Sequence, residues 1–153
     1  MIAATVWNRL IATLQNNPTL SGYVKYVYEG YREPETMDVT NMPCLMLEPV
    51  QDGEIDKYMN LIQDIYLTIN LFAFSSNNFN EFPKTIVGDQ NYRGILDINN
   101  DLRACLISSN TLGGNVIDIK IQPTVMDSLP TGKYPIRGLL MPIKILYRQL
   151  DGV

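Results

Sequence analysis

The chain has 153 residues, of which 12 are Lys or Arg, 16 are Asp or Glu and none is His. This length predicts a single domain over residues 1–153. Without His, the chain lacks the commonest general base and zinc ligand, and Ser–His and Cys–His nucleophile pairs are excluded. A net charge of −4, with cations at least four positions apart, argues against tight binding of duplex DNA.

Residues 1–9 have no basic stretch before their apolar residues, so they do not resemble a signal peptide. No apolar run approaches the ~20 residues of a membrane span, and we expect a protein of the cytoplasm with no membrane partner. Cys44 and Cys105 each lie in an apolar run without metal-ligand spacing. This predicts two buried, reduced thiols, with a disulfide as the less favoured alternative.

The first segment, residues 2–15, predicts an amphipathic helix that ends before Pro18. Its apolar positions at helical spacing are Ile2, Val6, Leu10, Ile11 and Leu14. Residues 23–31 are rich in Tyr and Val and predict a strand. Residues 32–42, with one Pro and several acidic residues, predict a loop.

Residues 43–49 form a short apolar run between prolines, which predicts a second strand. Residues 51–57 predict a turn or hairpin tip. The longest strand signal covers residues 65–73, where strict alternation predicts one core face. The other face carries aromatic as well as polar side chains, so we expect a neighbour to cover it. The long polar connection over residues 75–90 is predicted to be a functional or partner-facing segment.

Residues 94–108 predict the second helix, whose early acidic residues suit the helix dipole. Its apolar face comprises Ile95, Ile98, Leu102, Cys105 and Leu106. Two further strands are predicted over residues 116–122, with Ile117 and the next two alternate isoleucines facing inward, and over residues 139–148. Pro142 on the outward face of the last strand indicates an edge position.

The order helix, three strands, helix, two strands predicts an α+β fold. Consecutive strands joined by turns indicate a largely antiparallel sheet, with two helices packed on one face.

Two local patterns were weighed as binding sites for phosphate or nucleic acid. Gly132-Lys133 resembles the end of a phosphate-binding loop, but Asp127 and Tyr134 stand where that loop needs Gly and Ser or Thr. The four tyrosines of residues 23–31 could stack on single-stranded nucleic acid, which requires interleaved cations. Nearby acidic residues favour sheet or protein contacts instead.

Asp52, Glu54 and Asp56 alternate along the predicted hairpin tip. A calcium loop would need Glu at its twelfth position, where Gln63 stands, so a solvated acidic surface is the better interpretation. We therefore expect no metal and no cofactor. Paired carboxylates could still serve acid–base chemistry, which leaves a small carboxylate-based cytosolic enzyme as an alternative.

The order of elements and several sequence strings resemble the tail terminator, or tail completion, proteins of long-tailed bacteriophages. The strings are the helix 2–15, Met42-Pro43-Cys44-Leu45-Met46-Leu47, the strand ending at Phe74, Gly94-Ile95-Leu96-Asp97-Ile98-Asn99-Asn100-Asp101-Leu102-Arg103-Ala104-Cys105-Leu106, Tyr134-Pro135-Ile136-Arg137 and Ile143-Lys144-Ile145-Leu146-Tyr147-Arg148. The resemblance covers nearly the whole chain. It departs from the family in the acidic stretch 29–38 and the Asn-rich stretch 77–80.

This resemblance implies a virion structural protein, not an enzyme, located at the head-proximal end of the tail after assembly in the host cytoplasm. Family members form a ring, usually a hexamer, that caps the tail tube, ends its polymerisation and joins the tail to the head-completion complex. The implied partners are copies of the chain itself, the tail tube protein, the head-completion or neck protein and, in contractile tails, the sheath protein. Genomic DNA would pass through the lumen without specific binding. A head–tail connector or neck protein is the nearest alternative, and a generic adaptor domain that stays monomeric is a further one.

Subunits of a ring meet through different surfaces of neighbouring copies. We expect these surfaces at the hairpin near residues 50–60 and at the outward aromatic side chains of the long strand. The candidate interface residues are Asp52, Glu54, Ile55, Asp56, Tyr66, Phe72 and Phe74.

Overall fold

The computed structural model describes residues 2–59, 62–76, 86–88, 93–114, 116–129 and 136–150. The predicted helices are confirmed as α1 (Ile2–Asn16) and α2 (Ile95–Ser108). The Asn-rich stretch 77–80 and the Gly132-Lys133 pair lie outside the described residues.

The strands form one sheet with the order β1-β2-β3-β6-β4, and β5 also pairs with β6. Their bounds are Tyr26–Glu29 for β1, Cys44–Met59 for β2, Ile62–Ser76 for β3, Val116–Ile121 for β4, Val125–Leu129 for β5 and Ile136–Leu150 for β6. Only the β1–β2 pair is parallel among the described strands. The predicted α+β class with a largely antiparallel sheet is therefore confirmed.

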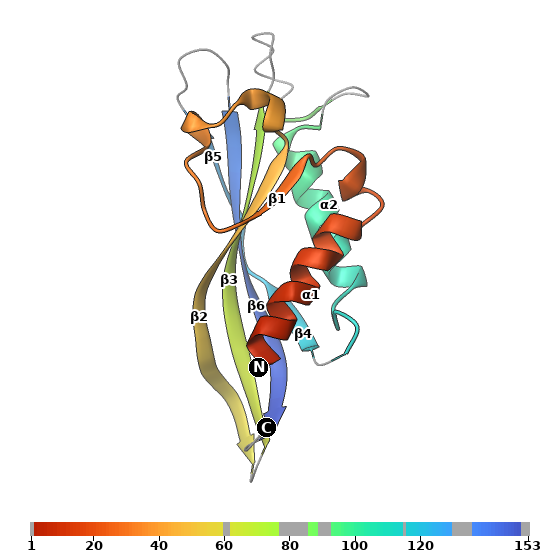
Figure 1. Ribbon diagram of the computed structural model, residues 1–153, viewed down its shortest axis with the longest axis vertical. Coiled ribbons are helices and arrows are strands. Elements are labelled where there is room, and N and C mark those ends of the chain that lie inside the picture. The colour runs from red at the N-terminus through yellow and green to blue at the C-terminus, as the bar shows by residue number, and fades with distance from the viewer. Residues whose placement is uncertain are drawn as a thin grey trace.

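Both helices pack against the same face of the sheet, here called the helix side (Figure 1). The core lies between these layers because each helix turns its predicted apolar stripe toward the alternating apolar residues of β3 and β6. Residues at or below 1% exposure in this core include Val6, Leu10, Leu14, Ile69, Leu71, Ile98, Leu102, Leu106, Ile143 and Tyr147. Predicted helix faces and the predicted core face of residues 65–73 are thus correct.

The start of α2 is fixed by an acidic side chain, as the sequence indicated. The Asp97 carboxylate accepts hydrogen bonds from the backbone N–H of Gly94 at 3.1 Å and of Gly88 at 2.9 Å. Helices leave their first N–H groups unpaired, and a carboxylate in the first turn also favours the positive end of the dipole. Asp97 therefore joins the 86–88 turn to the first turn of α2.

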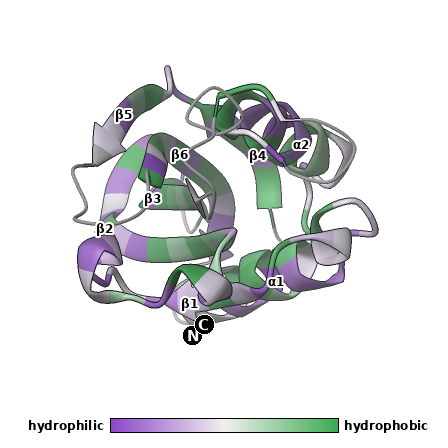
Figure 2. Ribbon diagram, turned by 90° about the horizontal axis from the view of Figure 1, so that it is seen from above, coloured by the Kyte–Doolittle hydropathy of each residue, from purple (hydrophilic) through white to green (hydrophobic). Residues whose placement is uncertain are grey.

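The sheet curls strongly when seen from above (Figure 2). On its outer face, away from the helices, the upper part carries a second, smaller core. This core comprises Met42, Cys44, Met46, Phe74 and Ile136. Two short 3-10 helices, Pro34–Thr36 and Val39–Asn41, lie in the preceding segment, which was predicted to be an irregular loop. The outer face of the long strand is therefore covered in part by the chain itself.

Pro142 does not mark an edge strand, because β6 pairs with β3 on one side and with β4 and β5 on the other. Its carbonyl accepts a hydrogen bond from Gln122 N–H at 2.9 Å, in the short break between β4 and β5. In a strand, the N–H and C=O of one residue point to the same side. Pro142 has no N–H, and the side of the strand on which that group would lie faces the break. No strand residue there needs the N–H as a hydrogen-bond partner.

The inward pattern predicted for residues 116–122 is wrong at its first position. A register shift between Val116 and Asp118 places Val116 in the core and leaves Ile117 exposed, while Ile119 is buried. One bulged residue reverses the facing of the residues that precede it.

Candidate assembly interface

The three acidic candidates do not lie at a hairpin tip. Strand β2 continues through Asp52, Glu54 and Asp56, and the hairpin turns between Met59 and Ile62. Gly53, which suggested a turn, has φ +108° and lies in a register shift between its two neighbours. A left-handed glycine can serve a bulge as well as a turn, so the local signal was real but the strand bends instead of ending.

The lower ends of β2, β3 and β6 extend past both helices (Figure 1). We call the lower half of these strands, with these ends, the arm: β2 from Gln51, β3 as far as Thr68, and β6 from Lys144. On the helix side, the upper residues of the arm still belong to the core. Strand β1 pairs only with Cys44–Leu47 and leaves the edge of β2 along the arm unpaired within the described chain.

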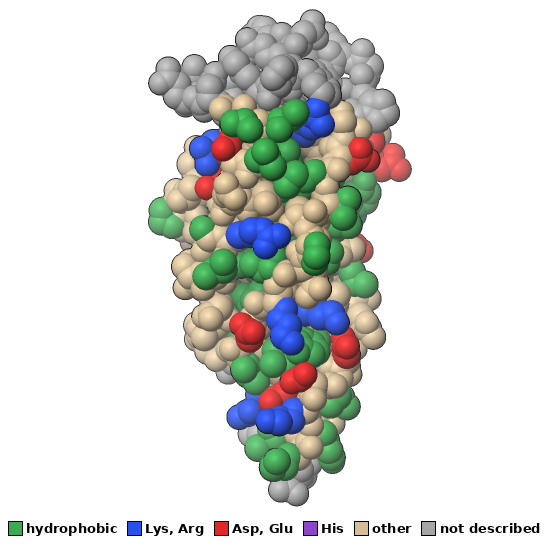
Figure 3. Space-filling model, turned by 180° about the vertical axis from the view of Figure 1, so that it is seen from behind, with side chains coloured by type: hydrophobic (Ala, Val, Ile, Leu, Met, Phe, Trp, Pro, Cys, Tyr) green, Lys and Arg blue, Asp and Glu red, His purple; other side chains and the backbone are tan. Residues whose placement is uncertain are grey.

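Charged side chains of the arm are paired with one another on the outer face, where Figure 3 shows cations and anions interspersed with apolar side chains. Lys144 Nζ lies 3.0 Å from Glu54 Oε2. Lys120 Nζ donates to the Tyr66 hydroxyl at 2.7 Å, and that hydroxyl donates to Asp56 Oδ1 at 3.2 Å. The hydrogen bond to Tyr66 raises the pKa of Lys120. Exposed ion pairs of this kind contribute ~0.2–1 kcal/mol each.

Two further carboxylates on the arm have defined partners. Arg148 donates to both oxygens of Asp64, at 2.9 and 3.2 Å, and this hydrogen bonding lowers the pKa of Asp64. On the helix side, the Tyr147 hydroxyl donates to Asp52 Oδ1 at 2.7 Å. Burial, followed by this hydrogen bond, raises the pKa of Tyr147. The acidic side chains of the arm therefore pair with side chains of neighbouring strands in the same chain.

Two of the three aromatic candidates are buried within one chain. Tyr66 is 6% exposed and Phe74 is 4% exposed. Phe72 is half-buried beneath Tyr31, whose ring centre lies 4.8 Å away. The expectation that these rings form an exposed outward face is therefore wrong for Tyr66 and Phe74. Ile55, in contrast, is more than half exposed on the arm.

Other exposed apolar side chains, which the sequence pattern did not single out, lie on the same strand as Ile55 or on the strand paired with it. Val50, Tyr58, Met59 and Ile62 are all exposed on the same hairpin. The sequence analysis assigned these residues to a turn or left them between elements. It therefore did not predict that they form part of a strand with an exposed apolar face. Their β-branched and aromatic types, continuous with the strand after them, were the available signal.

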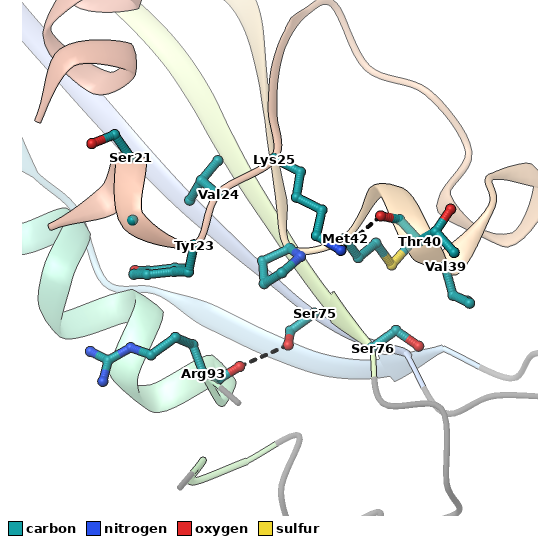
Figure 4. A pocket seen from close by; sticks show the side chains of 12 residues that line it. Ser21, Tyr23, Val24, Lys25, Val39, Thr40, Met42, Ser75, Ser76 and Arg93 are labelled. Carbon is teal, nitrogen blue, oxygen red and sulfur yellow. Dashed lines mark hydrogen bonds between the residues drawn. The ribbon is translucent and has the colours of Figure 1, made fainter. Parts of the chain in front are cut away.

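A pocket of 470 Å³ lies at the upper end of the molecule and includes Tyr23, Lys25, Thr40 and Ser75 (Figure 4). Lys25 Nζ donates to the Thr40 carbonyl at 2.9 Å, and Ser75 Oγ donates to the Arg93 carbonyl at 2.9 Å. Both groups are thus engaged with backbone oxygens, whereas the hydroxyl of Tyr23 donates to Asp101 Oδ2 at 2.7 Å. The pocket thus offers polar groups that are hydrogen-bonded within the chain, and one of its hydroxyls is paired with a carboxylate.

Three further features of the described chain concern its thiols, its metal-ligating side chains and the hydropathy of its helices. Cys44 and Cys105 are free and buried, as predicted, and burial raises the pKa of Cys44 to about 12. Among the residues described, no group of three or more Cys, Asp or Glu side chains is placed to hold a metal ion. In that same part of the chain, no helix has the length and apolar character required to cross a bilayer.

Comparison with known proteins found no matching family model and no matching curated protein.

Proposed function

We propose that the chain is a structural protein of a virion tail. It assembles as a ring, with six copies as the expected number, that caps the tail tube, ends its polymerisation and joins the tail to the head-completion complex. Support comes from the resemblance of its element order and strings to tail terminator proteins, and from an α+β fold of the predicted class, which has one more strand after α2 than the sequence predicted.

The observation that carries the proposal is the arm with its exposed apolar side chains. Ile55, Tyr58 and Met59 are each more than half exposed on the arm, and so is Val50 immediately before it. Large exposed apolar side chains that are concentrated on one element favour protein–protein contact there. The arm thus supplies a surface for a neighbouring copy or for the tail tube protein.

The charges of the arm suit a ring through which DNA passes. Lys144 and Arg148 are each paired with a carboxylate, Glu54 and Asp64 respectively. A cation already neutralised by a carboxylate gains less from a phosphate, and firm phosphate binding requires uncompensated cations. Paired cations therefore favour passage of DNA over retention.

The test combines oligomeric state with tail binding. Mass photometry and negative-stain imaging of the purified chain are expected to show rings, and these rings are expected to bind the ends of isolated tail tubes. Ile55→Asp should weaken ring formation or tube binding, whereas Leu96→Asp, at an exposed apolar position on α2, should not. A chain that stays monomeric at every concentration and ignores tube ends would contradict the proposal.

Binding to the portal side of the head, and not to tail tubes, would favour a head–tail connector or neck protein instead. Turnover of a substrate by the purified chain, lost in Asp56→Asn, would favour the carboxylate-based enzyme. These outcomes separate the three functions in one set of preparations.

A further inference from the structure

The upper part of the sheet ends in two short strands whose outer edges are unpaired within the described chain. There the strand order is β1-β2-β3-β6-β5, so β1 and β5 are the two edge strands. They lie on separate sides of the molecule in Figure 2. Each presents backbone N–H and C=O groups that another strand could pair with.

The lower part of the sheet has edges that resist such pairing. Along the arm, β2 has three register shifts between Pro49 and Lys57, and β4 has one between Val116 and Asp118. Bulges and edge charges are the usual means by which proteins prevent strand addition. The pairings of β1 and β5 contain no register shift, so their backbones remain regular.

The directions of the two edge strands suit contact between successive copies. Strand β1 is parallel to β2, and three antiparallel pairings lead from β2 to β5. Therefore β5 runs antiparallel to β1. In copies related by rotation about an axis along the strands, β5 of one copy would meet β1 of the next in antiparallel orientation, which gives the more stable ladder.

Exposed apolar side chains lie on both edges. Tyr26 on β1 is 49% exposed, and Val125 and Met126 on β5 are 63% and 37% exposed. Asp127 lies on the outer face of β5. At the other edge, the Arg32 guanidinium lies 4.2 Å from the ring centre of Tyr28, a residue of β1. Joining the two edges would bring opposite charges together.

A groove beside β1 offers room for a side chain from the partner strand. It has a volume of 360 Å³, lies between the end of α1 and β1, and includes Leu14, Val24 and Val27. Leu14 belongs to the core, so the groove opens on the helix side of the sheet. Met126, whose register partner Leu139 faces that core, also lies on the helix side of β5.

We propose that β5 of one copy adds to the free edge of β1 of the next copy, with Met126 entering the groove between α1 and β1. This inference rests on the proposed ring and assigns the surfaces through which its subunits meet. The contact joins two different surfaces, so it repeats head to tail and can close a ring. The occupant of the β1 edge is thus a second copy of this chain.

Covalent trapping tests this arrangement. In the double variant Tyr26→Cys with Asp127→Cys, a short bismaleimide should join successive copies into a ladder of dimers, trimers and larger species up to the ring. A mixture of the two single variants should give dimers only, and each single variant alone should give none. The wild-type chain should give none, because Cys44 and Cys105 are buried.

A second variant measures the same contact without cross-linking. Met126→Arg places a charge in the groove and should raise the ring dissociation constant at least about tenfold. Ile107→Arg is the matched control, because Ile107 is 66% exposed on α2 and belongs to neither edge, so it should leave the ring unchanged.

Wild-type rings that form while the double-cysteine variant gives no ladder would overturn the edge contact and leave the proposed function standing. Efficient cross-linking within either single variant would overturn it as well, since like edges would then meet. A monomeric wild-type chain would instead refute the proposed ring and this inference with it.

Discussion

Replacing Gly138 with Ala tests the packing of the small outer-face core. A Cβ at Gly138 would lie 2.8 Å from Cε1 and 3.0 Å from Cδ1 of Phe74. Ordinary carbon contacts are about 3.5–4.0 Å, so the ring must move by roughly 0.7 Å or more. It cannot do so freely, because it is buried against Met46 and Ile136.

Two opposing effects set the size of the loss. Overpacking a filled core typically costs ~1–3 kcal/mol. Replacing a strand glycine returns about 0.5–1 kcal/mol, because the unfolded chain loses less conformational freedom. The clash is the larger effect, so we expect a net loss of about 1–2 kcal/mol. In a domain of this size, each kcal/mol corresponds to about 2–4 °C, and the melting temperature should fall by about 2–8 °C.

Urea titration and thermal melting by circular dichroism measure this loss. Gly22→Ala is the matched control, because its Cβ would meet no atom within 4 Å. Combining Gly138→Ala with Phe74→Leu should recover part of the loss, with a coupling of about 1 kcal/mol. A Gly138→Ala protein as stable as wild type, or effects of the two substitutions that simply add, would refute the reasoning.

Three further predictions concern charge, thiols and backbone packing. The folded-state pKa of Asp64 is lowered by Arg148, so the pair stabilises the fold above about pH 4 and this contribution disappears on further acidification. Melting temperatures between pH 6 and pH 2 should therefore fall further in wild type than in Asp64→Asn; equal falls would contradict this. Neither Cys44 nor Cys105 should react with a thiol reagent at pH 8 until guanidinium unfolds the chain, and labelling of the native protein would show that burial is incomplete. Gly94→Ala would drive a methyl group into the backbone carbonyl oxygen of Ile86, so it should cost about 2–3 kcal/mol in urea titration; near-native stability would mean that the 86–88 turn can move aside.

Periodicity predicted most of the layers, because burial imposes it directly. The helix stripes of residues 2–15 and 94–108 and the alternation of residues 65–73 each reflect one buried face. These elements also contain few residues that favour another conformation. Where one physical requirement dominates, the sequence pattern is sufficient.

Bulges account for much of what the pattern missed. Around Gly53 an acidic, glycine-containing stretch signals a turn, yet tertiary pairing with β3 holds it in an extended, bent strand. At Ile117 a single inserted residue reverses the facing of the strand. Strand pairing is a contact between distant residues, so local composition carries little information about it.

The candidate interface was harder to predict than the fold. Exposure of Tyr66 and Phe74 depended on segments far away in the chain: Lys120 lies against the first ring, and Met42 packs in the cluster that buries the second. Strand β5 was missed altogether, since its residues alternate only weakly and β6 supplies the pairing. Which side chains remain exposed is therefore a property of the assembled sheet.

Strand β6 has a consequence for how the chain is made. It is the last strand in chain order, yet β3, β4 and β5 all pair with it. During synthesis, the ribosome will already have released α1, the β2–β3 hairpin and α2 before β6 emerges. Until then, the apolar face of β3 lacks its neighbour, and the nascent polypeptide is open to aggregation or to chaperone capture. Folding of the whole sheet therefore has to wait until β6 has left the ribosome.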